Sequence, residues 1–173
     1  MKVPELRSAP VDVDIDVIRD ADGWPPEAVL VRICDQAVAA ACSQGEVVLA
    51  DGCELAILFA DDERVRDLNS EFRSKDQPTN VLSFPSIGDG VRGEPTHLGD
   101  IVLAYETVAR EAEESGKPFE HHLAHLVMHG FLHVLGYDHE DEAEARVMEA
   151  LETRALASLG IADPYADEDE DEP

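Results

Sequence analysis

The chain has 173 residues and a formal net charge of −26, and 44% of its residues are apolar. This length and composition predict one domain with a buried core rather than a disordered chain, and the negative charge disfavours nonspecific adhesion to nucleic acid. No apolar run is long enough to span a membrane and the N-terminus has no continuous apolar core, so we expect no membrane partner, no signal peptide and a cytoplasmic location.

Strands and helices alternate in the first half of the chain. Residues 11–18 alternate apolar and acidic side chains, the period-2 pattern of a strand with one buried face. Residues 25–45 begin with proline, contain many alanines and end in glycine, which predicts a largely buried helix. Residues 53–60 form an apolar run typical of a buried strand. Residues 61–73 open with the capping residue Asp61 and have apolar side chains at helical spacing, which predicts a second helix.

Two more strands follow in the middle of the chain. Residues 79–84 have the composition of a strand, which Pro85 stops. Residues 86–96 are rich in glycine and predict a loop. Residues 98–104 predict a fourth strand.

The rest of the chain has helical patterns. One helix ends near Gly116, the next runs from Pro118 to Gly136, and the last covers about residues 140–160. Four strands and about five helices in this order predict an α+β fold with a small mixed sheet, in a single domain.

Two compositional features complete this prediction. The three cysteines, Cys34, Cys42 and Cys53, are odd in number and lack C-x-x-C spacing, so we expect buried, reduced thiols. The last eleven residues contain seven acids and no base. We therefore place the domain at residues 1–162 and an acidic, disordered tail at residues 163–173.

The segment HGFLHVLGYDH, from His129 to His139, contains the strongest chemical signal. His129 and His133 are four residues apart, so on a helix their side chains lie about 40° apart around the axis and about 6 Å along it. A left-handed turn at Gly136 brings His139 back toward the same face. Three neutral imidazoles and an open fourth position are what catalytic zinc requires, so we predict a zinc site at the end of this helix.

The neighbouring residues leave alternatives open. His125 lies one helical turn before the motif and either supports a ligand, contacts substrate or is a partly exposed helix residue, which we favour. His121 and His122 diverge around the helix and are interpreted as surface residues, as is His97. Asp138 either orients a histidine or caps the next helix.

The array is similar to the zinc-protease motif H-E-x-x-H but lacks its glutamate, which acts as general base. Gly130 occupies that position. This departure counts against peptide hydrolysis by the familiar route.

A second constellation lies in LNSEFRSKDQPTNVLSFP, residues 68–85, within the least acidic part of the chain. If the sheet packs against the histidine helix, Arg73 projects toward the metal. An arginine fork suits phosphate oxygens and the charge that develops in phosphoryl chemistry. The alternative is an ordinary surface arginine that is favoured at a helix C-terminus.

These segments, together with LGDIVLA, resemble the YbeY family of bacterial endoribonucleases and rRNA maturation factors. The resemblance runs from Cys53 to Tyr165 and implies an α+β fold, one bound zinc ion and cleavage of single-stranded RNA. It further implies a role in maturing the 16S rRNA 3′ end and in ribosome quality control. The expected partners are therefore the 16S rRNA precursor and the small ribosomal subunit or its proteins, but not DNA.

The resemblance also implies roles for particular residues. His129, His133 and His139 take the places of the metal ligands, and His129 carries catalytic weight beyond ligation. Arg73 takes the place of a functionally important arginine, and Lys75 lies beside it in the expected RNA groove. Whether water or the ribose 2′-oxygen attacks stays open.

Two other functions compete with this interpretation. One is a zinc peptidase or other small-molecule hydrolase, which the histidine array favours and Gly130 disfavours. The other is a non-enzymatic assembly factor with a structural metal, which the apparent open coordination position disfavours. The strong acidity of the chain suggests that a ribosome or a protein partner delivers the RNA.

Overall fold

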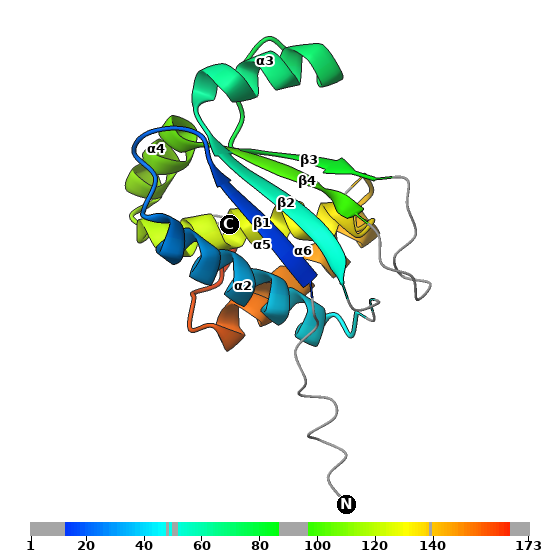
Figure 1. Cartoon of the computed structure of the whole chain (residues 1–173). Coiled ribbons are helices and arrows are strands. Elements are labelled where there is room, and N and C mark those ends of the chain that lie inside the picture. Colours follow the sequence, from blue (N-terminus) through cyan, green and yellow to red (C-terminus); the bar gives the residue numbers. More distant parts are fainter. Residues whose placement is uncertain (1–12, 48, 50–51, 87–96, 139, 167–173) are drawn as a thin grey trace, which may run out of the picture.

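The computed structural model describes residues 13–47, 49, 52–86, 97–138 and 140–166. Its strands form one four-stranded sheet in the order β1-β2-β4-β3 (Figure 1). Strands β1 (Val13–Arg19), β2 (Cys53–Ala60) and β4 (His97–Ala104) are parallel, and β3 (Val81–Pro85) pairs antiparallel with β4 at the edge. The mixed sheet confirms the predicted α+β class.

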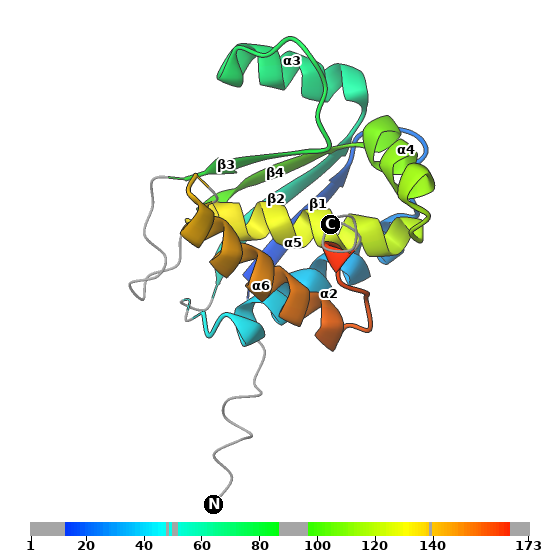
Figure 2. The same ribbon diagram turned by 180° about the vertical axis from the view of Figure 1, so that it is seen from behind.

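Five helices surround this sheet in the described residues. Helices α2 (Glu27–Gln44), α5 (Phe119–Val134) and α6 (Glu142–Ser158) lie on one side of it, and α4 (Tyr105–Ser115) crosses at one end. Figure 2 shows α6 against α5 and α2 on the side away from the sheet. Helix α3 (Asp62–Arg73) stands on the opposite face of the sheet. The large core therefore lies between the sheet and α2, α5 and α6.

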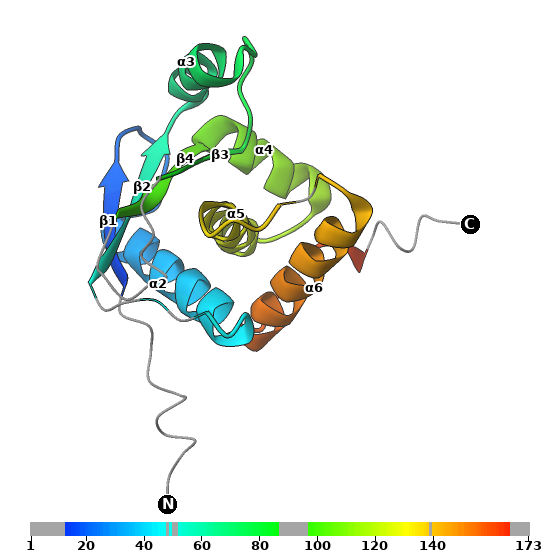
Figure 3. The ribbon, with the colours of Figure 1, turned by 90° about the vertical axis from the view of Figure 1, so that its right-hand side faces the viewer.

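Helix α5 runs through the middle of this core. Figure 3 shows it end-on, encircled by the sheet, α4, α6 and α2. Its buried positions are almost all apolar, and its histidines and Glu120 occupy positions that are half-buried or exposed. Its buried residues are Leu123, Ala124, Leu126, Val127, Met128, Gly130, Phe131, Leu132 and Val134. The histidines of α5 therefore sit on a helix whose position is fixed from every side.

Gly130 is the point of closest approach between α5 and the sheet. A Cβ atom there would lie 3.0 Å from Cγ2 of Ile101 and 3.3 Å from both Oγ of Ser83 and Cγ2 of Val81. The Ser83 hydroxyl also donates a hydrogen bond to the Gly130 carbonyl, at 3.1 Å. A larger side chain at this position requires these side chains of the sheet to shift, so the close packing disfavours the glutamate of the zinc-protease motif.

The C-terminus of α5 ends in the predicted left-handed turn. Gly136 has φ +105°, and its N–H donates to the carbonyl of His133 while the N–H of Tyr137 donates to that of Leu132. This is the Schellman arrangement, which requires a positive φ. A Cβ atom on Gly136 would meet nothing within 4 Å, so backbone conformation rather than space favours glycine here.

The predicted helices and strands agree with the structure apart from shifts of a few residues at their ends. The cysteines are free and buried, and burial raises the pKa of Cys34 and of Cys42 to about 12. Packed structure continues through residues 163–166, inside the predicted tail, because Tyr165 contacts Glu152. Residues 167–173 and most of the predicted 86–96 loop lie outside the described residues.

The packing at Gly130 predicts the effect of restoring the protease glutamate. We expect Gly130→Glu to lower the free energy of unfolding by about 4 kcal/mol, since it overpacks the core and buries a carboxylate without a partner. His121→Glu places the same side chain on an exposed position of α5 and should change stability by about 0.5 kcal/mol or less. Urea unfolding of both variants checks this. Equal midpoints for the two variants would show that the space at Gly130 does not matter.

Candidate functional site

A cleft of about 780 Å³ lies along the edge strand β3. One wall is the C-terminal part of α5 and the turn after it, which contribute His129, His133 and Gly136. The other wall is β3 with the end of α3 and the connection between them, which contributes Arg73 and Lys75. The cleft therefore brings together the two segments that the sequence analysis singled out.

His129 and His133 face each other in this cleft. Their Nε2 atoms are 3.1 Å apart, and their ring centroids are 4.6 Å apart. Two nitrogen ligands of a tetrahedral zinc ion with Zn–N bonds of 2.0–2.1 Å lie about 3.3 Å apart. The spacing of these two nitrogens therefore fits a shared metal ion. His139, the third predicted ligand, lies outside the described residues.

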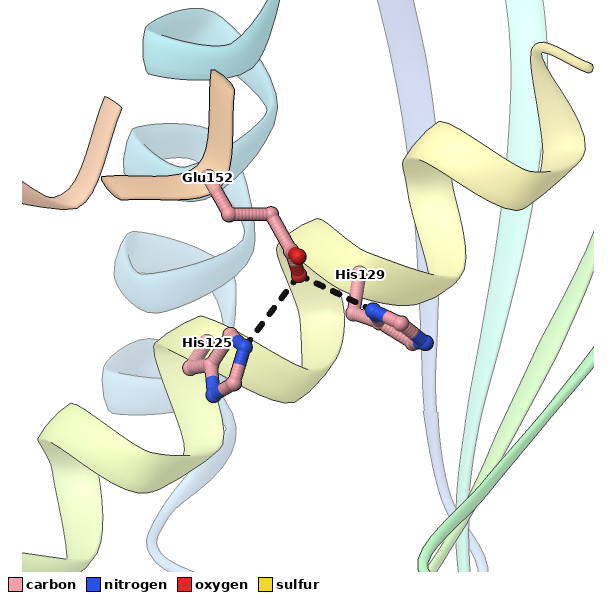
Figure 4. A group of neighbouring side chains, drawn as sticks. All are labelled: His125, His129 and Glu152. Carbon is pink, nitrogen blue, oxygen red and sulfur yellow. Dashed lines mark hydrogen bonds and ion pairs between the residues drawn. The ribbon is translucent and has the colours of Figure 1, made fainter. Parts of the chain in front are cut away.

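Glu152 contacts the nitrogen of His129 that faces away from His133. Its side chain comes from α6 and is 0% exposed, and its Oε2 atom lies 2.9 Å from Nδ1 of His129 (Figure 4). An ionised carboxylate only accepts hydrogen bonds, so Nδ1 of His129 must carry the proton. The lone pair of Nε2 then points toward His133. Such a carboxylate–histidine pair fixes ring orientation and tautomer in metal sites.

Two further groups complete the environment of Glu152. Nε2 of His125 lies 3.2 Å from the same Oε2 atom, and the Tyr165 hydroxyl donates to Oε1 at 2.7 Å. Burial, the largest single influence, raises the pKa of Glu152, but the hydrogen bonds and charges of His125 and His129 together outweigh it and lower the pKa to about 2. Glu152 is therefore a buried, ionised carboxylate with donors on both oxygens.

His125, His129 and Glu152 form a second group that could hold a metal ion, with their ligand atoms within 4.8 Å of one another. This group uses Nδ1 of His129, whereas the pair with His133 uses Nε2. An ion bound among these three residues has to displace the protons that the two imidazoles donate to Glu152. The two arrangements therefore differ in which nitrogen of His129 binds the metal.

The structure corrects one prediction for the other histidines and resolves another. His122 is not a surface residue: its side chain is 11% exposed, its Nε2 lies 2.9 Å from Glu111, and burial lowers its pKa despite that partner. The role of His125 was left open with a partly exposed position favoured, and the structure gives it a specific hydrogen bond to Glu152. His121 is exposed, as predicted.

Glu152 was not among the residues predicted from the sequence. The signal was present, because apolar residues lie four before it, one before it and three after it in α6: Met148, Leu151 and Ala155. A single carboxylate on an otherwise apolar stripe has to be paired when the helix packs. The position of Glu152 on α6 therefore indicated a buried carboxylate with a hydrogen-bonding partner.

Arg73 reaches the cleft from the last turn of α3. Its Nη2 donates to the carbonyl of Ser83 at 2.6 Å, and its guanidinium carbon lies 5.4 Å from the centroid of Phe84. These contacts hold an exposed arginine at the sheet edge. Lys75 is also exposed, and in the part of the chain that the structure describes neither cation pairs with a carboxylate. Arg66, in contrast, is bound to Asp76 at 2.8 Å.

Two asparagines anchor the connection between α3 and β3. The buried side chain of Asn69 donates to the carbonyl of Gln77 at 2.8 Å. Asn80 donates to Glu111 at 3.1 Å and accepts from the backbone N–H of Val81 at 2.7 Å. The wall of the cleft that carries Arg73 is therefore fixed at both ends.

Comparison with known proteins gives consistent results. The chain matches the family described as Endoribonuclease YbeY over residues 26–160. It is 50% identical over 157 residues to the protein named Endoribonuclease YbeY from Rhodopseudomonas palustris (strain BisB18). That match covers 89% of this chain and 93% of the relative. It is 54% identical over 153 residues to the protein of that name from Chelativorans sp. (strain BNC1), with 88% and 93% covered.

One solved structure supports the fold. The solution structure of TM1509 from Thermotoga maritima is 21% identical in sequence and has a TM-score of 0.53. The match covers 91% of this chain and 96% of that chain. At this level of identity the likeness concerns the fold alone.

Because Glu152 orients His129, we expect substitution of Glu152 to lower the affinity of the site for a metal ion. Glu152→Ala should weaken binding of a divalent transition-metal ion about 10- to 100-fold, because His129 loses the acceptor that orients it. Glu152→Gln, which keeps the shape but not the charge, should lose less. Glu149→Gln, on an exposed position of α6, serves as control. Competition with a chromogenic chelator measures the affinities, and a folded Glu152→Ala protein with unchanged affinity would contradict the prediction.

Proposed function

Because the chain belongs to the YbeY endoribonuclease family, we propose that it is a zinc-dependent endoribonuclease that cleaves single-stranded RNA. The observation that carries the proposal is the cleft in which two facing imidazoles lie opposite an arginine without a carboxylate partner among the described residues. Imidazole nitrogens suit zinc, and guanidinium groups suit phosphate oxygens.

His129, His133 and His139 are the proposed zinc ligands. The facing Nε2 atoms of the first two support this assignment. Asp138 and Glu140, which flank His139 in the sequence, line the same cleft. Three nitrogen ligands leave a fourth position open, which is typical of catalytic zinc sites. When bound, the zinc ion supplies a Lewis acid next to the scissile phosphate.

The chain's own groups then have separate tasks. The guanidinium of Arg73 binds a phosphate oxygen and stabilises the negative charge that develops on phosphorus substituents in the transition state. Lys75 contributes further positive charge to the same wall of the cleft. Glu152 keeps the proton of His129 on Nδ1 and so keeps Nε2 available. His129 thus connects the buried carboxylate to the substrate side of the site, which is the basis of the catalytic weight we assign to it.

The packing at Gly130 argues against the competing zinc peptidase. The familiar peptidase route needs a glutamate beside the first histidine as general base, whereas this chain has Gly130, packed closely against side chains of the sheet.

The proposed cellular substrate is the 16S rRNA precursor, with roles in maturing its 3′ end and in ribosome quality control. We infer that the small ribosomal subunit or one of its proteins presents the RNA, because a net charge of −26 disfavours tight binding of free RNA at physiological salt. This function implies a cytoplasmic location. Within the described residues, no helix combines the length and apolarity that crossing a bilayer requires.

Substitution of Arg73 tests the proposed chemistry. Arg73→Ala should lower kcat/KM for a single-stranded RNA about 100-fold or more, because the transition state loses its charge partner. Arg73→Lys should recover only part of this loss, since a lysine cannot form the two-pronged contact. Arg146→Ala on the exposed face of α6 is the matched control. Full cleavage activity in folded, metal-loaded Arg73→Ala would remove Arg73 from the mechanism. Complementation of an rRNA-processing defect by a variant that no longer cleaves RNA would favour the non-enzymatic assembly factor.

Substitution of His133 tests the metal. His133→Ala should lose bound zinc and cleavage together, with zinc content measured by mass spectrometry on the same samples used for the RNA assay. Loss of zinc with cleavage retained would remove the metal from the mechanism. Cleavage of a generic peptide pool but not of RNA by the zinc-loaded wild type would favour the peptidase instead.

A further inference from the structure

Phe72 is an exposed aromatic ring beside the candidate site. It lies on α3 and is 60% exposed, whereas Val65 on the same helix is fully buried. The other large apolar residues exposed in the described part of the chain are all aliphatic: Ile18, Val31 and Val147. Among the described residues, Phe72 is therefore the one exposed large apolar residue that is aromatic, and it lies next to Arg73.

The ring of Phe72 is held in place. It packs edge-to-face on Phe84, with centroids 5.5 Å apart and an interplanar angle of 69°. The guanidinium of Arg73 lies over the same Phe84 ring, at 5.4 Å. Phe84 thus fixes both an exposed aromatic ring and the cation that lines the cleft. We call Phe72, Phe84 and Arg73 the aromatic platform.

The charges around the aromatic platform indicate what it suits. On the same face of the sheet as α3, the neighbouring strands present exposed acids: Asp14, Asp16, Glu54 and Asp100. A nucleic acid backbone is repelled by that surface and attracted by Arg73 and Lys75. Bases carry no charge and stack on aromatic rings, which is how proteins bind single strands without sequence readout.

We propose that Phe72, supported by Phe84, stacks against a nucleobase of single-stranded RNA whose adjoining phosphate is bound at Arg73. The proposal rests on the proposed function and deepens it, because it gives a physical reason for a preference for single strands. A base inside a duplex has both faces covered and is not available to Phe72. The interaction selects unpaired nucleotides irrespective of sequence.

The test uses the zinc-loaded, full-length chain and a single-stranded 2′-O-methyl octanucleotide with 2-aminopurine at successive positions. Phe72→Ala and Phe72→Leu should weaken binding about tenfold and abolish the fluorescence quenching at one position, since neither side chain has an aromatic face. Phe72→Tyr should restore both. Val147→Ala, which removes an equally exposed apolar side chain from α6, should bind as wild type. Thermal unfolding checks that every variant is folded.

An abasic nucleotide provides the decisive comparison. At the quenched position, an abasic nucleotide should lower the affinity of the wild type about tenfold and should not lower the affinity of Phe72→Ala any further. Three results would each overturn the platform. The abasic nucleotide could lower the affinity of both proteins equally, Phe72→Leu could bind as tightly as the wild type, or the wild type could show no measurable binding. Cleavage by the wild type is assayed separately on unmodified RNA. If Phe72 stacks on the base but the RNA is not cleaved, the proposed function alone is refuted. If the RNA is cleaved but the effect of the abasic nucleotide does not depend on Phe72, the platform alone is refuted.

Discussion

The carboxylate of Glu152 joins three parts of the chain that are far apart in sequence. It receives hydrogen bonds from His125 and His129 of α5 and from Tyr165 near the C-terminal end of the described residues. A fully buried charge is costly unless every oxygen has a partner, so the packing of α6 on α5 depends on the hydrogen bonds from both imidazoles. The orientation of His129 toward the cleft is a consequence of this core interaction.

Helix α5 presents two neighbouring faces at the site. Gly130 lets one face lie directly on β3 and β4, and His129 and His133 leave the helix beside the edge strand. Because β3 is an edge, its outer side is open, and Arg73 reaches it from the other face of the sheet to bind the Ser83 carbonyl. The same edge therefore brings imidazoles and a guanidinium together in a chain that is otherwise strongly acidic.

Local patterns in the sequence were sufficient for most of the fold and for part of the site. The four-residue spacing of His129 and His133 and the glycine at position 136 are properties of a single helix and its end, and the structure has both. The partners of His122 and His125 were not predictable in this way. Glu111 and Glu152 lie on other helices, and pairing across helices depends on how they pack rather than on any periodicity. A lone carboxylate on the apolar stripe of α6 was the available clue.

In the proposed zinc site, His129 binds the metal through Nε2 together with His133 and His139. X-ray absorption at the zinc edge of the loaded chain tests it most directly. We expect three imidazole ligands in the wild type, two or fewer in His133→Ala and His139→Ala, and an unchanged first shell in His125→Ala. A spectrum that changes in His125→Ala but not in His133→Ala would place the ion with Glu152 and contradict this account.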